Sequence, residues 1–316
     1  MTAAGPQTLA DLGEFGVIDV VTSAFPVTPA VLIGSGDDAA CLAVSGPVLV
    51  TTDQLVERRH FRRDWSEAGD VGRRAVAASL ADIAAMGGTA TGLVVGLAAP
   101  SDLPVDWVRE LAAGMAEEVA LVGATIVGGD LTEADEIVIS VTALGHAEAE
   151  PLRRGGARTG QVVAVAGRLG WAAAGLAVLG RGFRSPRAVV AAYRRPEPPY
   201  AAGPQAAAAG ATAMIDVSDG LLADLGHVAD ASAVAIDVDS SSVEIAEPLE
   251  AVGAAIGIEP VAFCLTGGED HALAATFDAS ASLPEGWRPI GRVNEGNGVT
   301  VDGEEYEGPG GHAHFG

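Results

Sequence analysis

The chain has 316 residues, of which 49% are hydrophobic and only 4% aromatic, so its cores must be built mainly from aliphatic side chains. This length predicts about two domains and is ample for buried cores. The formal net charge of −24 argues against nucleic acid as a partner, because a phosphate backbone requires a basic surface. The same acidity suits a protein that gathers divalent cations, and it equally suits an acidic enzyme that does not.

All 18 basic residues are arginine, and the sequence contains no lysine. This excludes a P-loop lysine, the strand lysine of protein kinases and any Schiff-base lysine. If the chain handles nucleotides, metal ions and arginines must neutralise the phosphates. Cys41 and Cys264 are too few for a disulfide framework or a zinc site, and we expect small buried apolar residues rather than reactive thiols. We see no signal peptide and no apolar run long enough for a membrane span, so we expect a cytoplasmic protein without membrane contact.

The first half of the chain alternates helices and strands. Helices are predicted at 8–25, 71–87 and 104–122, and strands at 31–33, 48–50, 90–99, 124–127 and 136–146. The segment 53–61 is expected to be a mixed-charge loop. The order of these elements predicts a compact α/β domain.

Two adjacent carboxylates, Asp37 and Asp38, follow the apolar run 31–33 inside a glycine-containing turn. Neighbouring anions repel one another unless a cation lies between them or water screens them. Asp53 follows the next strand and is expected near the same point. We interpret this pattern as a magnesium site for a nucleotide, with an exposed acidic turn as the alternative.

Three further polar residues in this half are candidates. Asp82 lies near the carbonyl end of its predicted helix, where a negative charge is disfavoured unless a cation or solvent compensates it. Asp130 follows two glycines at a predicted strand end, which suits a ligand close to the backbone or an ordinary turn. His60 stands beside two arginines and could hold a phosphate, or it could be a plain surface histidine.

The segment 151–160 is polar, glycine-rich and basic, and we expect the junction between an N-terminal domain, 1–148, and a C-terminal domain, 149–316, there. Its arginines, Arg154 among them, are candidate phosphate contacts because guanidinium groups grip phosphate with two prongs. Beyond it, strands are predicted at 162–166, 233–238, 289–293 and 299–301, one more strand ends at Asp216, and helices are predicted at 170–180, 187–195, 201–210 and 245–256.

Asp216, Ser218 and Asp219 form the strongest motif of the second half. Asp216 ends a strand, and Ser218 is a natural N-cap for the helix that follows. A helix N-terminus attracts anions while the aspartates attract metal, so this spot suits a metal–phosphate pocket. Ordinary capping would explain Ser218 but not Asp216. The segment 267–273 repeats the theme, with Glu269 and Asp270 between two glycines and an apolar strand.

Together these motifs converge on one design: single carboxylates held on different strands, as Mg²⁺ requires when substrate oxygens and waters complete its coordination. Six motifs, taken in order along the chain, resemble those of the thiamine-monophosphate kinase family. They are Gly-Asp-Asp-Ala-Ala around Asp38, Thr-Thr-Asp followed by Leu-Val-Glu and His-Phe, Ala-Ala-Met-Gly after Asp82, Gly-Gly-Asp, Asp-Val-Ser-Asp-Gly and Gly-Gly-Glu-Asp. That family belongs to the aminoimidazole ribonucleotide synthetase superfamily. The resemblance runs from about residue 10 to the C-terminal His-Phe.

The resemblance implies an α/β (α+β) fold of two domains, with an N-terminal mixed sheet that pairs across a homodimer. It implies transfer of the γ-phosphoryl group of ATP to thiamine monophosphate, with several Mg²⁺ ions. Since the acceptor is itself a phosphate and largely dianionic, we expect no acid–base residue. The metal ligands that it implies are Asp38, Thr51, Thr52, Asp53, Asp82, Asp130, Asp216 and Asp219. The implied ATP contacts are Gly129, Asp130, Arg154 and Ser218, and the implied contacts to the thiamine phosphate are His60, Glu269 and His312.

The sequence departs from the family pattern at three places. Ser79 and Ala81 stand where the family has asparagine and serine before Asp82. His271 replaces a tyrosine after Gly-Gly-Glu-Asp, and His312 replaces an aromatic residue near the end. These changes leave open a non-catalytic nucleotide or thiamine-phosphate binding protein. Another ATP-dependent enzyme of the superfamily, such as a selenophosphate synthetase or hydrogenase maturation factor, and a metal-dependent phosphohydrolase are the remaining alternatives.

Overall fold

The structure is a computed structural model that describes residues 7–35 and 39–308, and it divides into two compact units. The N-terminal unit comprises Met1–Ile83 and Thr89–His146, and the C-terminal unit comprises Ala84–Gly88 and Ala147–Gly316. The short segment 84–88 belongs to the second unit because Ala84 and Ala85 are buried in a core cluster with Phe277 and Trp287.

The N-terminal unit contains three helices and six strands among the described residues. The helices are α1 (Leu9–Thr22), α2 (Ala68–Ala85) and α3 (Val105–Ala120). The strands are β1 (Val31–Ile33), β2 (Cys41–Leu42), β3 (Val48–Val56), β4 (Thr89–Ala99), β5 (Thr125–Glu133) and β6 (Val138–His146).

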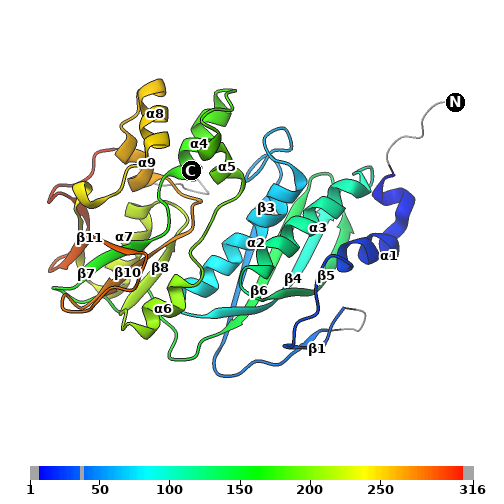
Figure 1. Ribbon diagram of the computed structural model, residues 1–316, viewed down its shortest axis with the longest axis horizontal. Helices are drawn as coiled ribbons and strands as arrows, with labels where there is room; N and C mark the ends of the chain where they lie inside the picture. The colour runs from blue at the N-terminus through cyan, green and yellow to red at the C-terminus, as the bar shows by residue number, and fades with distance from the viewer. Residues whose placement is uncertain (1–6, 36–38, 309–316) are drawn as a thin grey trace. The chain divides into compact units, whose positions relative to one another are not determined.

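Four of these strands form a mixed sheet in the order β3-β6-β4-β5, in which only the β4–β5 pair is parallel. Helices α2 and α3 cover one face of this sheet (Figure 1). The other face carries exposed apolar side chains on β3, with Val48 48% and Val50 64% exposed. Since side chains alternate along a strand, each strand residue belongs either to the helix-covered face or to this open face.

Glycine allows α2 and α3 to lie close together. A Cβ atom at Gly114 of α3 would lie 2.1 Å from the carbonyl oxygen of Gly69, and one at Gly72 of α2 would lie 2.1 Å from that of Leu111. Such backbone contact leaves no room for a side chain. The two helices therefore pack with their backbones in contact on one face of the sheet.

The C-terminal unit contains the remaining helices and strands. Its helices are α4 (Trp171–Gly180), α5 (Arg187–Arg194), α6 (Ala202–Ala208), α7 (Leu221–Ser232), α8 (Glu247–Ile256) and α9 (Pro260–Thr266), with a 3-10 turn η1 (Ser240–Ser242). Its strands are β7 (Val162–Ala166), β8 (Ala213–Val217), β9 (Ala235–Val238), β10 (Ala272–Phe277), β11 (Trp287–Asn294) and β12 (Gly298–Val301).

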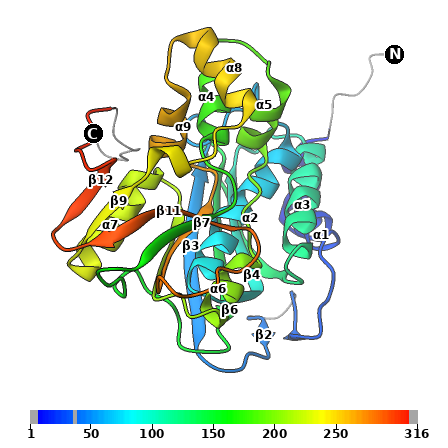
Figure 2. The same ribbon diagram turned by 60° about the vertical axis from the view of Figure 1, so that its left-hand side comes forward.

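These strands form a second mixed sheet in the order β12-β9-β11-β7-β10-β8, and Figure 2 labels β12, β9, β11 and β7 of it. All neighbours are antiparallel except β12 and β9. Strand β10 is buried along its whole length, and Phe277 meets Trp287 edge to face with ring centroids 5.4 Å apart. The two mixed sheets with their helices confirm the predicted α/β (α+β) class.

Two predicted strand boundaries are wrong, because pairing with neighbouring strands extends both strands beyond the predicted turns. Strand β5 continues through Gly128 and Gly129 to Glu133, paired with β4. Gly129 is required by this close approach rather than by a turn, since a Cβ there would lie 1.9 Å from the carbonyl oxygen of Val95. Asp130 is therefore inside a strand rather than after it. The first part of the predicted loop 53–61 is also strand, since β3 runs to Val56.

Two further corrections concern the C-terminal unit. Helix α7 begins at Leu221 with Gly220 as its N-cap, so Ser218 is not the capping residue. Helix α9 was not predicted, because its seven residues are too few to show a helical period.

Among the described residues, no individual helix is both long enough and apolar enough to cross a bilayer. Helices α8 and α9 together have the required length and composition, but they are bent by 110° relative to each other.

Candidate active site

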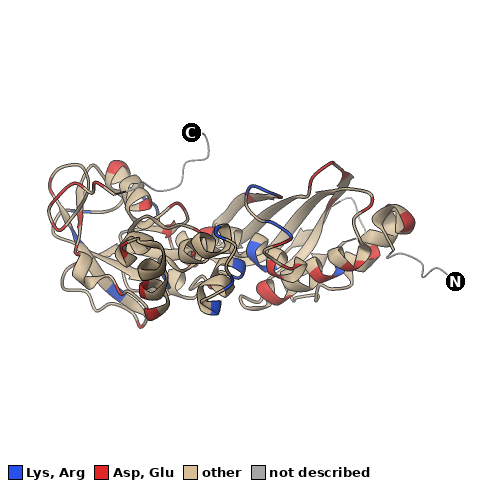
Figure 3. Ribbon diagram, turned by 90° about the horizontal axis from the view of Figure 1, so that it is seen from above, with Lys and Arg blue, Asp and Glu red and all other residues tan. Residues whose placement is uncertain are grey.

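Acidity alone does not locate a site in this molecule. Asp and Glu residues lie on helices and loops of both units (Figure 3). The candidate residues must therefore be distinguished by their contacts and burial.

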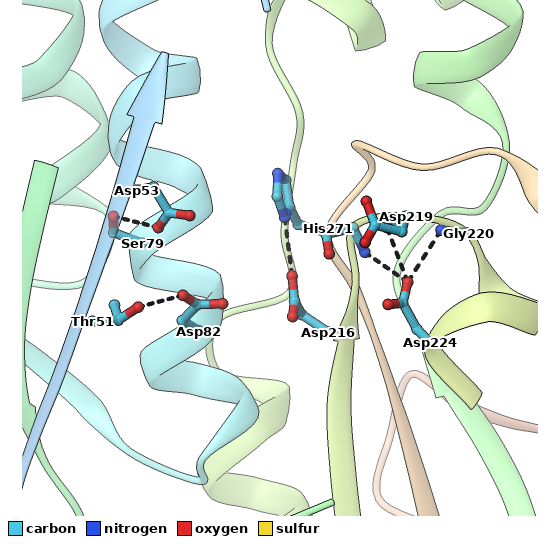
Figure 4. Close-up of polar contacts among 10 residues, drawn as sticks. Thr51, Asp53, Ser79, Asp82, Asp216, Asp219, Gly220, Asp224 and His271 are labelled. Atoms are coloured by element: carbon cyan, nitrogen blue, oxygen red, sulfur yellow. Dashed lines mark hydrogen bonds and ion pairs between the residues drawn. The ribbon is translucent and has the colours of Figure 1, made fainter. Parts of the chain in front are cut away.

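In the N-terminal unit, one face of β3 and one face of α2 bring four oxygen-bearing side chains together (Figure 4). Thr51 Oγ1 donates a hydrogen bond of 2.5 Å to Asp82 Oδ2, and Ser79 Oγ lies 2.8 Å from Asp53 Oδ2. Thr51 and Asp53 share this face because they are two residues apart on a strand. Ser79 and Asp82 share a helix face because they are three residues apart. We call this group the β3–α2 cluster.

The β3–α2 cluster offers only oxygen ligands, which are the donors that Mg²⁺ prefers. It holds two carboxylates, and no group of three or more His, Cys, Asp or Glu side chains in 7–35 and 39–308 is arranged to hold a metal ion. A cation here would need phosphate oxygens and waters to complete its coordination. That incompleteness fits an ion delivered with a nucleotide rather than a permanent structural metal.

The structure does not bring Thr52 and Asp130 into this cluster. Thr52 Oγ1 accepts a hydrogen bond of 3.0 Å from Thr142 Oγ1, on the open face of the sheet. Asp130 occupies the row of Ser140 and Gln54, which also faces away from Asp53. Strands β3 and β5 form opposite edges of the sheet, so Asp53 and Asp130 are separated by three strand spacings, about 14 Å.

Asp38 lies outside the described residues. The preceding part of its segment reaches strand β5, because Ser35 Oγ donates to the carbonyl oxygen of Val127 at 3.1 Å. Gly129 and Asp130 follow Val127 on the same strand. Within this unit, the β3–α2 cluster and the β5 residues are therefore two separate groups.

His60 lies in the connection that follows β3. Its Nδ1 accepts a hydrogen bond of 3.0 Å from the backbone N–H of Val56, so the neutral ring carries its proton on Nε2. Beside it, a surface pocket of about 520 Å³ is lined by Glu57, Arg58, Arg62, Arg63 and Asp64. Arg63 forms an ion pair of 2.7 Å with the buried Glu57, and this pair holds the Arg63 side chain in the pocket wall. The pocket is thus rich in arginine although the protein as a whole is acidic.

In the C-terminal unit, the segment between β8 and α7 is held by one buried carboxylate, Asp224 (Figure 4). Its Oδ2 accepts hydrogen bonds from the backbone N–H groups of Ser218, Asp219 and Gly220, at 3.0, 3.0 and 3.1 Å. These bonds fix the backbone that presents Asp219. Burial, joined by the negative charges of Asp216 and Asp219, raises the pKa of Asp224 to about 7, although the backbone donors act in the opposite direction.

The segment 267–271, which we call the GGED loop, packs directly on this backbone. Glu269 N donates to the carbonyl oxygen of Ser218 at 2.9 Å, and a Cβ at Gly268 would lie 2.0 Å from that same oxygen. Glu269 and His271 both have positive φ angles, 70° and 52°, which are costly for residues other than glycine. The surrounding contacts hold the loop in this conformation.

The GGED loop also places two buried polar side chains. His271 Nδ1 lies 3.1 Å from Asp216 Oδ2. Asp270 Oδ1 accepts a hydrogen bond of 2.9 Å from the N–H of Ala172 at the start of α4. Burial raises the pKa of Asp270 to about 7, while the Ala172 N–H and the charge of Arg168 act to lower it.

Arg154 is exposed, and the structure places its backbone at the far end of α7 from Ser218. Its carbonyl oxygen accepts a hydrogen bond of 3.1 Å from Ser232, the last residue of that 12-residue helix. The helix is about 18 Å long, so Arg154 and Ser218 do not form one contact group within this unit. His312 lies outside the described residues.

Sequence reasoning missed the supporting roles of Ser79, Asp224 and His271. The signal for Asp224 was its place in Asp-Val-Ser-Asp-Gly-Leu-Leu-Ala-Asp, four residues after a glycine where a helix begins. Ser79 had a weaker signal, since it precedes Asp82 by three residues on a helix. Nothing in the spacing of Asp216 and His271 indicates their contact, because it depends on the pairing of β8 with β10.

The fold and its two matching family models define a protein of the AIR synthase related class. The family model of the N-terminal domain of AIR synthase related proteins matches residues 36–147, and that of the C-terminal domain matches residues 158–304. The hydrogenase maturation protein HypE, at 20% identity and a TM-score of 0.71, shares the fold.

Within this class, the chain belongs to the thiamine-monophosphate kinase family. It is 47% identical over 313 residues to the thiamine-monophosphate kinase of Mycobacterium tuberculosis, covering 98% of this chain and 93% of that protein. The crystal structure of the kinase from Stenotrophomonas maltophilia K279a has a TM-score of 0.81 at 32% identity, covering 93% of this chain and 98% of the other. A structure of AaThiL complexed with AMPPCP and TMP has a TM-score of 0.78 at 31% identity, covering 99% and 100%.

Proposed function

We propose that this chain transfers the γ-phosphoryl group of ATP to thiamine monophosphate and so makes thiamine diphosphate. The observation that carries the proposal is the similarity over almost the full length to thiamine-monophosphate kinases, including AaThiL bound to AMPPCP and TMP. The competing superfamily member HypE shares only 20% identity, which supports a common fold and nothing further.

The acceptor in this reaction is itself a phosphate, largely dianionic at neutral pH because its second pKa is about 6. It needs no general base, and we assign none. The barrier comes from bringing two polyanions together, so catalysis depends on positioning and on neutralising charge. Side chains fixed by hydrogen bonds, such as Thr51 to Asp82, suit that task better than a mobile acid or base.

Mg²⁺ is part of this proposal. Asp53, Asp82 and Thr51 would hold it in the N-terminal unit, and Asp216 and Asp219 would hold it in the C-terminal unit, because their donors are all oxygen. The metal would neutralise phosphate charge when bound. We retain Asp38, Thr52 and Asp130 as proposed ligands, although the latter two stand on the open face of their sheet.

ATP and substrate contacts are proposed on the same basis. The proposed ATP contacts are Gly129, Asp130, Arg154 and Ser218. Gly129 carries no side chain, because its backbone lies against that of β4. His60, Glu269 and His312 are the proposed contacts to thiamine monophosphate. The positive φ of Glu269 supports a functional role for it, since such strain is retained where the surroundings require it.

We also propose a cytoplasmic homodimer formed through the open face of the N-terminal sheet. The exposed valines Val48 and Val50 on that face support it, since contiguous exposed apolar residues favour association. A Val50→Asp variant should shift the mass measured by light scattering from dimer to monomer, while Val27→Asp, at a residue 86% exposed on another segment, should not. A wild-type monomer would contradict this part of the proposal.

The decisive experiment is an assay for thiamine diphosphate from ATP, Mg²⁺ and thiamine monophosphate. Asp130→Asn should abolish turnover and leave the far-UV circular dichroism unchanged. Binding of both ligands without product would favour a non-catalytic binding protein. Release of inorganic phosphate without acceptor would favour a phosphohydrolase, and turnover of other superfamily substrates would favour another enzyme of the class.

A further inference from the structure

The contact between His271 and Asp216 joins two buried polar side chains of the C-terminal unit. Nδ1 of His271 lies 3.1 Å from Oδ2 of Asp216, and the two residues are only 6% and 5% exposed. Figure 4 shows the imidazole directed at this carboxylate. An ionised carboxylate only accepts hydrogen bonds, so Nδ1–H is the donor of this contact in the tautomer that pairs with a carboxylate anion.

The backbone of His271 is held by its pairing with β8. Its N–H donates to the carbonyl oxygen of Val217 at 3.1 Å, next to Asp216 on β8. Strand β10 then continues the pairing, with Leu273 opposite Asp216. The positive φ of 52° at His271 is therefore held by strand pairing, and the imidazole has a defined approach to the carboxylate.

Burying a carboxylate without a hydrogen-bond donor carries a large desolvation cost. The imidazole N–H of His271 offsets part of that cost for the buried Asp216. It also selects one rotamer, with Oδ2 held by His271. A carboxylate oriented in this way is prepared to offer its other oxygen to a cation. Partners that orient ligands are commonly worth 10- to 100-fold in metal affinity.

This geometry depends on histidine at position 271. A tyrosine, which the family pattern has there, carries its donor at the far end of the ring and has no donor at the Nδ1 position. Phenylalanine would keep the ring and lose the donor. Asparagine would place an amide N–H near the Nδ1 position, and it tolerates positive φ better than most residues.

We propose that His271 is a positioning residue: it orients Asp216 so that this carboxylate binds the divalent cation that accompanies ATP. The inference rests on the proposed function, because it takes Asp216 as a metal ligand. His271 does not touch the substrates and moves no proton in this role. Its contribution is the fixed orientation of one carboxylate.

The test measures Mn²⁺ binding by electron paramagnetic resonance, with and without AMPPCP, together with kcat and the apparent KM for Mg²⁺. His271→Phe should weaken Mn²⁺ binding 10- to 100-fold. His271→Asn should stay within about threefold of wild type, and this rescue by a shorter donor separates orientation from packing. His146→Phe, at a histidine that contacts Thr91 in the N-terminal unit, is the matched control and should bind Mn²⁺ normally.

Unchanged Mn²⁺ affinity in His271→Phe would overturn the inference, and so would an equal loss in His271→Asn and His271→Phe. If His271→Phe fails to fold, His271→Gln replaces it, because its amide reaches the Nε2 rather than the Nδ1 position and should show the loss. Asp216→Asn tests separately whether Asp216 is a metal ligand at all. Normal Mn²⁺ binding in that variant would remove Asp216 from the proposed site. Wild-type protein that binds Mn²⁺ with AMPPCP but makes no thiamine diphosphate would contradict the proposed function and leave the inference about His271 standing.

Discussion

Thr51 on β3 and Asp82 on α2 are joined by a hydrogen bond of 2.5 Å between Oγ1 and Oδ2. Asp82 lies in the last turn of its helix, where the helix dipole disfavours a negative charge. The hydroxyl of Thr51 partly offsets that cost and fixes the carboxylate rotamer. The sequence showed the conflict at Asp82, and the structure adds the donor that relieves it.

Thr51→Val should reduce kcat at least tenfold, because valine has the shape of threonine but no hydroxyl to orient Asp82. Thr51→Ser keeps the hydroxyl and should stay within about threefold of wild type. Both variants should melt within a few degrees of wild type, since the residue is only partly buried. The comparison is made from initial rates at saturating ATP, and a fully active Thr51→Val variant would refute a role for this hydroxyl.

Asp224 supports a prediction about stability and nucleotide binding together. Asp224→Ala would leave three backbone N–H groups at the start of α7 without their acceptor, at a typical cost of 1 to 3 kcal/mol for each buried unsatisfied donor, or roughly 3 to 5 kcal/mol in all after local relaxation. The apparent KM for ATP should rise as well, because this backbone carries Ser218 and Asp219. Urea unfolding and steady-state kinetics measure the two effects.

The control for this prediction is Asp230→Ala, which removes an exposed aspartate from the same helix and should change neither quantity appreciably. Asp224→Asn should fall between the two, since its amide oxygen can still accept. If Asp224→Ala unfolds like Asp230→Ala, the three hydrogen bonds contribute no net stability.

The sequence predicted most elements of this fold, and its errors come from interactions between distant segments. Local periodicity places α2 and α3 because their apolar faces repeat within one helix. Local periodicity fails at Gly129, because glycine is required there by the close approach of the β4 backbone and not by a turn. The extension of β3 past Asp53 is likewise set by its pairing with β6.

The candidate site was predictable to the same degree. Residue type and predicted position identify the candidate ligands from local sequence: Asp53 and Asp216 through predicted strand ends, and Asp82 through its place near the end of a helix. The face on which Asp130 lies could not be predicted, because strand register decides it and a one-residue shift reverses every side chain. The Asp216–His271 contact belongs to the same category, since it joins residues 55 apart in sequence.

The two cysteines should differ sharply in reactivity. We expected both to be buried, and Cys41 is exposed, because β2 is a two-residue strand that leaves it at the surface. Cys264 is buried, and burial, with the nearby charges of Asp270 and Glu244, raises the pKa of its thiol to about 12. Since the thiolate is the reactive form, Ellman's reagent should label Cys41 alone in the native protein and both cysteines in urea. Native Cys41→Ser protein that still reacts would contradict this assignment.

Asp270 should make stability depend on pH near neutrality. Its pKa is raised from 3.8 to about 7 by burial, so between these values the folded protein holds a proton that the unfolded chain has lost. Folding is therefore favoured at low pH by this group, and the contribution disappears as pH rises through about 7. The slope is at most about 1.4 kcal/mol per pH unit.

Asp270→Asn tests this prediction, because asparagine retains an oxygen for the N–H of Ala172 but cannot ionise. Urea unfolding of both proteins from pH 5 to 8.5 should show wild type losing stability relative to the variant as pH rises from 5 to about 7, with little further relative change above about pH 8. The difference between the two curves is what matters, since other groups titrate in both proteins alike. Asp278→Asn, at an exposed aspartate that accepts from Gln161, is the matched control and should give a curve parallel to wild type. Parallel curves for Asp270→Asn and wild type would show that Asp270 stays ionised in the folded protein, held by Ala172 and Arg168.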